Sequence, residues 1–467
     1  MRNPASVPRI RSCTRSLGRG VATPFVRGAT ERPLRIVFDH GSIAQDATTE
    51  ALAGFAHHDL IDAVEIDGSG GIPALAFGDV NVAADMMDVV KHASGKSHFV
   101  AFGQAQLPDF ARDFVVEGLG TDPALMEREL RVAGVAAAWG ADALVTDSDF
   151  LLTVAPRPMV ADANPVRPEQ AIALCGLYLR SRDDFTIAMD STYSWALSRQ
   201  AFDWALARAL LPAGWRFFGH CLAADPNLDG PVPYLAQAVF ERVAQALRAR
   251  ERVVLHSRRG GGFGPADEQL FYFDHAVLAL GGAFDAVARV ADATYGLANK
   301  PQGISWRYES WLPRIALVAP GLAALMENGG RARDVLDAIS ILRNTIHGEP
   351  LQGIRFSEGS VVRRQEHLVK IPRGKATALL GVLDRLDGRE RWGVRTVCTD
   401  FLFFRADEFI DVLMTEACRA LDQLMAATDV SRLPNGTQIA IQDGPSASGG
   451  DEFAPEAQRA IRALAGL

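Results

Sequence analysis

The chain contains 467 residues, of which 48% are hydrophobic and 22% are charged, a composition typical of a globular protein with two or three domains. Its formal net charge of −8 excludes nucleic-acid binding through overall positive charge, although a local basic patch is compatible with it. No apolar run reaches the roughly 18 residues of a membrane span, and the five cysteines lack the spacing of a zinc site or a disulfide framework. We therefore expect a cytoplasmic protein without membrane association.

Residues 1–32 are predicted to form a disordered tail. Six arginines and no acidic residue occur among the first 30 residues, together with serine, proline and glycine. A transit peptide has a similar composition, whereas the apolar core of a secretory signal does not follow. The composition favours a tail and leaves a targeting segment as the alternative.

Residues 33–155 alternate between short apolar runs and helical patterns. Four apolar runs are predicted to be strands: 34–38, 63–66, 99–102 and 143–146. Four further stretches are predicted to be helices: 48–57, 81–92, 107–117 and 122–139. Because strands that alternate with helices form mostly parallel sheets covered on both faces, we expect an α/β domain here.

The remainder of the chain is predicted to be mainly α-helical. The proline-rich residues 156–168 are predicted to be a linker that leads into a helical domain over 169–430. A small β-hairpin is expected over 354–371, and 431–467 is expected to be a loose tail with one short helix over 455–464. The helices predicted within the domain are 168–179, 192–211, 234–250, 266–297, 312–328, 331–347, 376–386 and 406–427.

Acidic residues stand at the ends of two predicted strands in the α/β domain. Asp39 ends the first strand, and Asp147 and Asp149 follow the last one. The carboxyl ends of parallel strands face the ligand crevice of such a sheet. Carboxylates that converge there can hold Mg²⁺ or Mn²⁺, which favour oxygen ligands. In the alternative interpretation, Asp39 and Asp147 cap the helices that follow the strands.

The apolar strand that runs through Thr146 into Asp147, within residues 140–151, resembles the end of a PIN-type ribonuclease domain. The segment Ile36-Val37-Phe38-Asp39 resembles the first strand and first acidic ligand of that family. The resemblance implies a PIN-like fold with a divalent metal site. The implied metal ligands are Asp39, Asp147, Asp149 and an acid of the preceding helix, Glu127 or Glu129, of which we take Glu129; Asp85 and Asp88 are candidates for a further ligand.

The predicted helix over 331–347 carries a second candidate site at its end. Its apolar residues form one narrow stripe: Val335, Ile339, Leu342 and Ile346. Arg343 and His347 lie four residues apart at the edge of this stripe, so they share one face of the helix. Histidine can transfer protons near neutral pH and arginine can hold a phosphate, so the pair can cleave RNA through its 2′-hydroxyl. A structural alternative is that both residues only stabilise the helix end through its dipole.

The segments Arg343-Asn344 and His347-Gly348-Glu349-Pro350 resemble the Arg and His motif of the HEPN superfamily of helical domains. Many members of that superfamily are ribonucleases in phage-defence and toxin systems. The resemblance implies an HEPN-like helical domain, a homodimer, and catalytic roles for Arg343, Asn344 and His347 without a cofactor.

Both resemblances lead to one hypothesis, an endoribonuclease that acts on RNA phosphodiesters, with a role in phage defence or a toxin system. One alternative is a non-catalytic dimeric binding or scaffold protein. A second alternative is a small-molecule α/β enzyme that uses the acidic crevice near Asp39 and Asp147.

Overall fold

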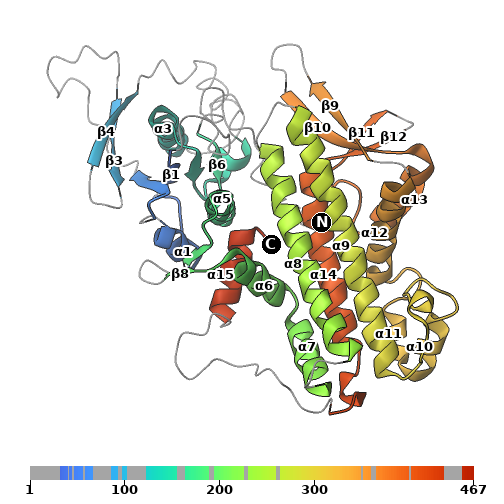
Figure 1. The fold of residues 1–467 in the computed structure, drawn as a ribbon. Helices are drawn as coiled ribbons and strands as arrows, with labels where there is room; N and C mark the ends of the chain where they lie inside the picture. The colour runs from blue at the N-terminus through green and yellow to red at the C-terminus, as the bar shows by residue number, and fades with distance from the viewer. Residues whose placement is uncertain are drawn as a thin grey trace, which may run out of the picture. The chain divides into compact units, whose positions relative to one another are not determined.

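The protein divides into two compact units in the computed structural model (Figure 1). The α/β unit comprises residues 1–197 and 463–466, and the helical unit comprises residues 198–462 and Leu467. The structure describes residues 32–39, 41–44, 47–55, 58–66, 86–92, 97–102, 123–154, 163–188, 194–225, 230–258, 263–348, 351–358, 364–398, 401–435 and 455–467.

The α/β unit contains a six-stranded sheet with the order β4-β3-β2-β1-β5-β6. Strands β2, β1, β5 and β6 run parallel to one another. Strands β3 and β4 extend the sheet beyond β2 as an antiparallel pair. Ile36 of β1 lies between Ala63 of β2 and Ala143 of β5. The strands are β1 (Leu34–Asp39), β2 (Ile61–Ile66), β3 (Met86–His92), β4 (Ser97–Phe102), β5 (Ala143–Val145) and β6 (Pro165–Val166).

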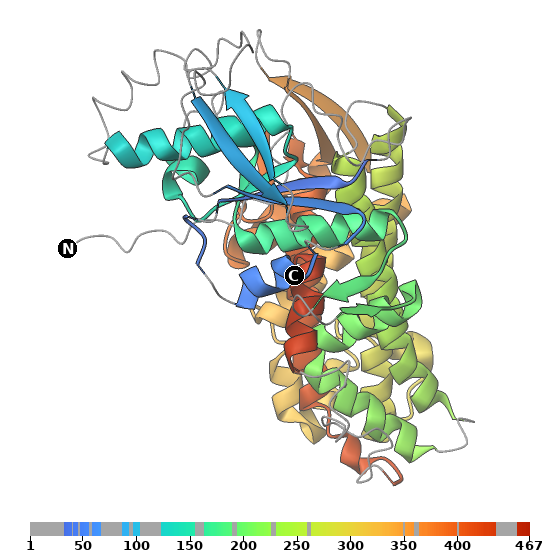
Figure 2. The same cartoon turned by 90° about the vertical axis from the view of Figure 1, so that its left-hand side faces the viewer.

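Helices cover both faces of this sheet (Figure 2). The helix α3 packs Val132 and Val135 against Val37, Val64 and Leu144 of three neighbouring strands. On the other side α1 and α5 pack against each other. Since β1 is buried almost throughout, its run of apolar residues is that of a parallel strand covered on both faces. The remaining elements of the unit are α1 (Ala47–Phe55), α3 (Pro123–Trp139), the π-helix η3 (Phe150–Val154), α5 (Pro168–Ser181), β7 (Thr186–Ala188) and β8 (Ser194–Ala196).

The helical unit is built around two long helices, α8 (Pro231–Arg258) and α9 (Phe263–Thr294), which lie side by side (Figure 1). Helices α12 (Arg331–Gly348) and α14 (Ala406–Ala427) pack against α9. The other helices are α6 (Arg199–Leu210), α7 (Pro212–Ala224), η4 (Pro301–Gly303), α10 (Leu312–Val318), α11 (Pro320–Ala324), α13 (Arg373–Arg385) and η5 (Val430–Arg432); α15 (Pro455–Ala465) follows near the end of the chain.

A four-stranded antiparallel sheet with the order β11-β12-β10-β9 belongs to the helical unit. Its aromatic side chains join the core, since Phe404 contacts Phe273 of α9 and Phe409 of α14. The strands are β9 (Gln352–Glu358), β10 (Arg364–Ile371), β11 (Val394–Cys398) and β12 (Phe401–Phe404). The predicted hairpin over 354–371 is confirmed as β9 and β10, and β11 and β12 were not predicted.

The predicted α/β character is confirmed, but several predicted elements differ from the structure. The helix predicted over 81–92 is wrong, because residues 86–92 form β3. The helix predicted over 192–211 is wrong at its start, where β8 precedes α6. The helix predicted over 107–117 lies outside the described residues.

The boundary between the two units also differs from the predicted linker over 156–168. Pro165 and Val166 of that range pair with β5 as β6, and the following helix α5 belongs to the α/β unit. The units divide between Leu197 and Ser198. Within the described part of the chain, no helix is long and apolar enough to cross a membrane.

Candidate functional site

The first candidate site surrounds Asp39, the last residue of β1. Its carboxylate is fully buried, and one oxygen accepts a hydrogen bond from the Thr146 hydroxyl at 3.0 Å. The other oxygen pairs with the Arg128 guanidinium of α3 at 2.5 Å. Because β1 and β5 are parallel neighbours, the residues that follow them meet at one edge of the sheet, as predicted from the acids at the strand ends.

The segment after β5 is fixed by hydrogen bonds to the segment after β1. The hydroxyls of Ser42 and Thr146 are 2.8 Å apart, and the backbone N–H of Asp147 donates to the Ser42 hydroxyl at 3.2 Å. The backbone N–H of Ala44 donates to the Asp147 carboxylate at 3.2 Å. Asp147 therefore lies beside Asp39 as a partly exposed carboxylate on a tethered backbone.

Arg167, between β6 and α5, supplies the positive charge at the outer side of this site. Its guanidinium lies 2.9 Å from the Asp149 carboxylate and 3.9 Å from the Asp147 carboxylate. The Asp149 side chain is 82% exposed, so the site opens to solvent at this point. Arg167 was not predicted, because β6 is too short to be recognised as a strand in the sequence.

Glu129 of α3 is the fourth predicted metal ligand and is buried, with 6% of the residue exposed. Its Oε2 atom has no hydrogen-bond partner among the described residues. Burial raises the pKa of the Glu129 carboxyl, and the charges of Asp39 and Asp149 raise it further, whereas a hydrogen bond from Ser148 and the charge of Arg128 lower it. Glu129 therefore interacts electrostatically with Asp39 at the end of β1 and with Asp149 beyond β5.

The four predicted acids thus occupy one region, with two arginines among them. In the part of the chain that the structure describes, no three Asp, Glu, His or Cys side chains form a group that could hold one metal ion. The chemistry of the donors fits a hard divalent cation, because all are carboxylates and one buried oxygen lacks a partner. The Mg²⁺ or Mn²⁺ site stays a prediction.

The second candidate site lies at the end of α12, where the predicted helix is found. Ile339 and Leu342 are fully buried, while the Arg343 side chain is 43% exposed and Asn344 and His347 are exposed. The Arg343 guanidinium pairs with Asp285 of α9 at 3.4 Å. Asp285 was not predicted, because nothing in the sequence indicates which helix faces Arg343.

A second arginine approaches α9 close to Arg343. The Arg242 side chain of α8 lies against Gly282, where a Cβ atom would collide with the guanidinium. Arg343 lies over the adjacent Gly281. Among the described residues no acid pairs with Arg242. Two arginines therefore lie against the neighbouring positions Gly281 and Gly282 of α9, and one of them, Arg343, pairs with an acid.

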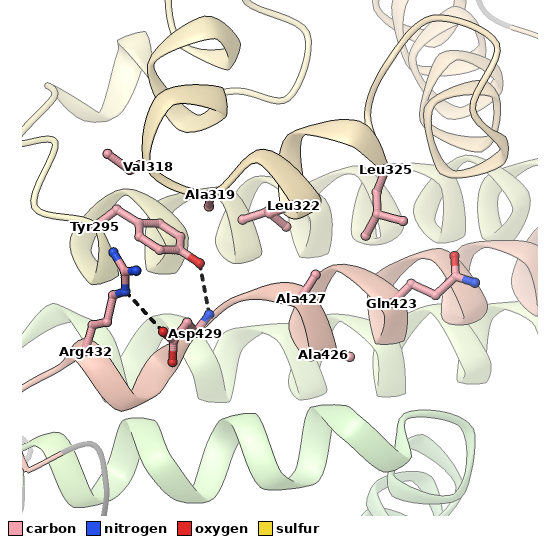
Figure 3. A pocket seen from close by; sticks show the side chains of 11 residues that line it. Tyr295, Val318, Ala319, Leu322, Leu325, Gln423, Ala426, Ala427, Asp429 and Arg432 are labelled. Atoms are coloured by element: carbon pink, nitrogen blue, oxygen red, sulfur yellow. Dashed lines mark hydrogen bonds and ion pairs between the residues drawn. The ribbon is translucent and has the colours of Figure 1, made fainter.

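The helical unit also contains an open groove of about 620 Å³ between α10–α11 and the end of α14 (Figure 3). Its walls are mostly apolar and include Leu322, Leu325, Ala426 and Ala427. Three of its polar residues contact one another, since the backbone N–H of Asp429 donates to the Tyr295 hydroxyl at 3.0 Å and Arg432 pairs with the Asp429 carboxylate at 3.1 Å. The groove contains none of the predicted site residues.

Comparison with known proteins gives no relative for this chain. No protein-family model, no curated protein and no solved structure matches it. A proposal for its function therefore depends on the chemistry of the acidic site around Asp39 and of the Arg343 site on α12.

Proposed function

We propose that the chain is a PIN-like ribonuclease that cleaves RNA phosphodiesters at the carboxyl ends of β1 and β5 with Mg²⁺ or Mn²⁺. The observation that carries this proposal is the burial of the Glu129 carboxyl. Its Oε2 atom lacks a hydrogen-bond partner among the described residues, and the charges of Asp39 and Asp149 raise its pKa. Burying an acid beside other acids opposes folding. A function that requires a cation at this place explains why the acids are kept together.

The residues of the site divide into cation ligands and groups that position them. Asp39, Glu129, Asp147 and Asp149 would have to draw closer together for their oxygens to hold the cation, which would activate water and stabilise charge on the phosphate. Thr146 holds the Asp39 carboxylate by its hydroxyl hydrogen bond, and Ser42 fixes the backbone that carries Asp147. Arg167 lies where a phosphate of the RNA backbone can contact it.

The exposure of the site favours a polymer over a small molecule as the substrate. The side chains of Asp149 and Arg167 are 82% and 34% exposed at its outer side. Small-molecule sites bury most of their ligand in a concave pocket. An open edge with an arginine suits a nucleic-acid strand that extends beyond the reacting phosphate.

The test is cleavage of labelled single-stranded RNA by the full chain in Mg²⁺, in Mn²⁺ and in EDTA. We expect cleavage that requires the cation and falls at least about 100-fold in Asp147→Asn, since even second-shell changes at metal sites cost roughly 10- to 100-fold. Asp62→Asn is the matched control, because Asp62 pairs with Arg35 away from the acidic site. Cation-dependent cleavage that survives Asp147→Asn and Glu129→Gln unchanged would refute this site.

A second candidate function is cation-independent RNA cleavage at the end of α12, as expected of an HEPN-like dimer. It is favoured by the ion pair with Asp285, which leaves the Arg343 guanidinium partly exposed one turn before the exposed His347. His347 would take the proton of the 2′-hydroxyl as its oxygen attacks the phosphorus and return a proton to the departing 5′-oxygen, while Arg343 stabilises the negative charge on the phosphate oxygens. Asn344 is exposed beside them.

The EDTA arm of the same experiment separates the two functions. Cleavage that survives EDTA and is lost in Arg343→Ala and His347→Ala would assign the activity to α12, with Arg289→Ala as the control for an exposed arginine of α9. RNA that is bound but remains intact in every arm would favour the dimeric scaffold. Light scattering of the same sample measures whether the chain is a homodimer.

A further inference from the structure

We propose that Arg128 is a positioning residue whose guanidinium neutralises Asp39 until a divalent cation binds, and then contacts a phosphate of the RNA. This inference rests on the proposed cation-dependent ribonuclease. It adds a residue that neither the sequence motifs nor the acid cluster assigns, and it makes cation binding and substrate binding depend on one another.

The Arg128 guanidinium occupies the place that a cation would take on Asp39. Its Nη2 atom lies 2.5 Å from Oδ1 of Asp39, while Oδ2 accepts the hydrogen bond from Thr146. Both oxygens of this carboxylate therefore have partners, although the side chain is fully shielded from water. A cation at Oδ1 would compete with Arg128, because two positive groups at one carboxylate oxygen repel each other.

Arg128 and a divalent cation are alternative partners of the Asp39 carboxylate, because a buried charge must be neutralised by one of them. A carboxylate that is removed from water requires a positive partner or coordination to a metal. Asp39 has Arg128 as that partner, whereas the adjacent Glu129 keeps an oxygen without one among the described residues. A divalent cation would neutralise both acids together, which a single guanidinium on Asp39 does not do.

Gly41 provides the space in which Arg128 lies. A Cβ atom at this position would collide with Nη2 of Arg128 and stand close to the centre of the guanidinium. The substitution Gly41→Ala should therefore push the guanidinium off Asp39 while keeping its charge in the protein.

A displaced Arg128 has the reach and the chemistry to bind RNA. Its side chain is 22% exposed while it pairs with Asp39, so the guanidinium already borders solvent. The planar fork of five N–H donors matches phosphate oxygens with two parallel hydrogen bonds. Arg128 would thus move from a protein carboxylate to a phosphate of the RNA backbone.

The experiment measures Mn²⁺ binding to the full chain by calorimetry and by electron paramagnetic resonance. We expect Arg128→Met and Gly41→Ala each to bind Mn²⁺ about tenfold more tightly than the unchanged chain, the effect of removing about 1.4 kcal/mol of competition. Arg35→Met is the matched control, because Arg35 lies at the other end of β1 and pairs with Asp62. Its Mn²⁺ affinity should not change.

The kinetics of RNA cleavage at saturating Mn²⁺ then distinguish Arg128→Met from Gly41→Ala. Arg128→Met should raise KM for RNA about tenfold with a small effect on kcat, because it removes one phosphate contact. Gly41→Ala retains the guanidinium and should leave KM near that of the unchanged chain. Gly41→Ala also tests the inference if loss of Arg128 prevents folding in EDTA.

Three outcomes decide between the inference and the function on which it rests. Tighter Mn²⁺ binding in both variants with the KM difference supports the role of Arg128. Equal Mn²⁺ affinity in the unchanged chain, Arg128→Met and Gly41→Ala, lost only in Asp39→Asn, overturns that role and leaves the cation site intact. Absence of Mn²⁺ binding in the unchanged chain and in all these variants overturns both.

Discussion

Asp39 and Glu129 are buried acids of the same site, but their charges are compensated differently. Asp39 pairs with Arg128, whereas Oε2 of Glu129 has no hydrogen-bond partner among the described residues. Burial is the largest cause that raises the pKa of Glu129 above its ordinary value of 4.5. The folded protein therefore binds this proton more tightly than the unfolded chain does. The contribution of Glu129 to stability falls as the pH rises from about 4.5 through the raised pKa.

Glu129→Gln should therefore stabilise the fold while it removes one ligand of the proposed cation site. In EDTA at pH 7.5, above the ordinary pKa of a glutamate, we expect the free energy of unfolding to rise by about 1 kcal/mol, the lower end of the cost of an unpaired buried polar group. Mn²⁺ binding should be lost. Thermal melts between pH 4 and pH 8 measure both effects, with the exposed Glu65→Gln as control. A destabilised Glu129→Gln variant at pH 7.5 would contradict this account.

The residues of the acidic site differ in how far the sequence predicts them. Asp39 ends an apolar strand and Asp147 and Asp149 follow another, and these positions can be recognised in the sequence without knowledge of the packing. Arg128 and Gly41 carry no such signal. Arg128 and Gly41 meet because α3 packs on the sheet beside β1. The two residues are far apart in the sequence, so the sequence does not indicate this contact.

The same distinction holds for whole elements. Strands β1, β2 and β5 were predicted from their apolar runs, whereas β3 was predicted to be a helix. The strand state of β3 comes from its pairing with β2 and β4, which local propensity does not encode. The two residues of β6 are too few to show any period, although their pairing with β5 brings Arg167 to the site.

A distant carboxylate caps the first turn of α7. Asp422 of α14 accepts hydrogen bonds from the backbone N–H groups of Ala213 and Gly214 at 2.8 and 3.0 Å. Leu211, which precedes the helix, offers no side-chain acceptor of its own. The start of α7 thus depends on the packing of α14. Gly214 of α7 leaves room for the side chain of Met425, which also belongs to α14.

Removing this cap should destabilise the helical unit. We expect Asp422→Ala to lower the free energy of unfolding by about 1–2 kcal/mol, as for other lost helix caps, and Asp422→Asn to cost less because it keeps an acceptor. Urea denaturation followed by circular dichroism measures the difference. Asp384→Ala is the control, since it breaks an exposed pair with Arg389 that water screens and that should contribute little to stability. Equal effects of Asp422→Ala and Asp384→Ala would contradict the capping role.

At the scale of the whole molecule, the α/β unit is formed from both ends of the chain. Residues 463–466 belong to it, and the Leu464 carbonyl accepts a hydrogen bond from the Arg180 guanidinium at 3.0 Å. Gly176 of α5 lies against the same carbonyl, where a Cβ atom would collide with it. The sequence predicted a helix over 455–464 but not its partner, because a terminal amphipathic helix does not encode the surface that it covers.

The division into two units predicts which part of the protein responds to a cation. In differential scanning calorimetry of the full chain, saturating Mn²⁺ should raise the midpoint of the transition of the α/β unit and leave that of the helical unit unchanged. At 100 times the dissociation constant, binding to the folded state alone contributes about 2.7 kcal/mol. Asp39→Asn should abolish the shift, whereas His347→Ala on α12 should retain it. A shift of the helical transition that persists in Asp39→Asn would show that the cation binds elsewhere, because a ligand stabilises only the cooperative unit that holds its site.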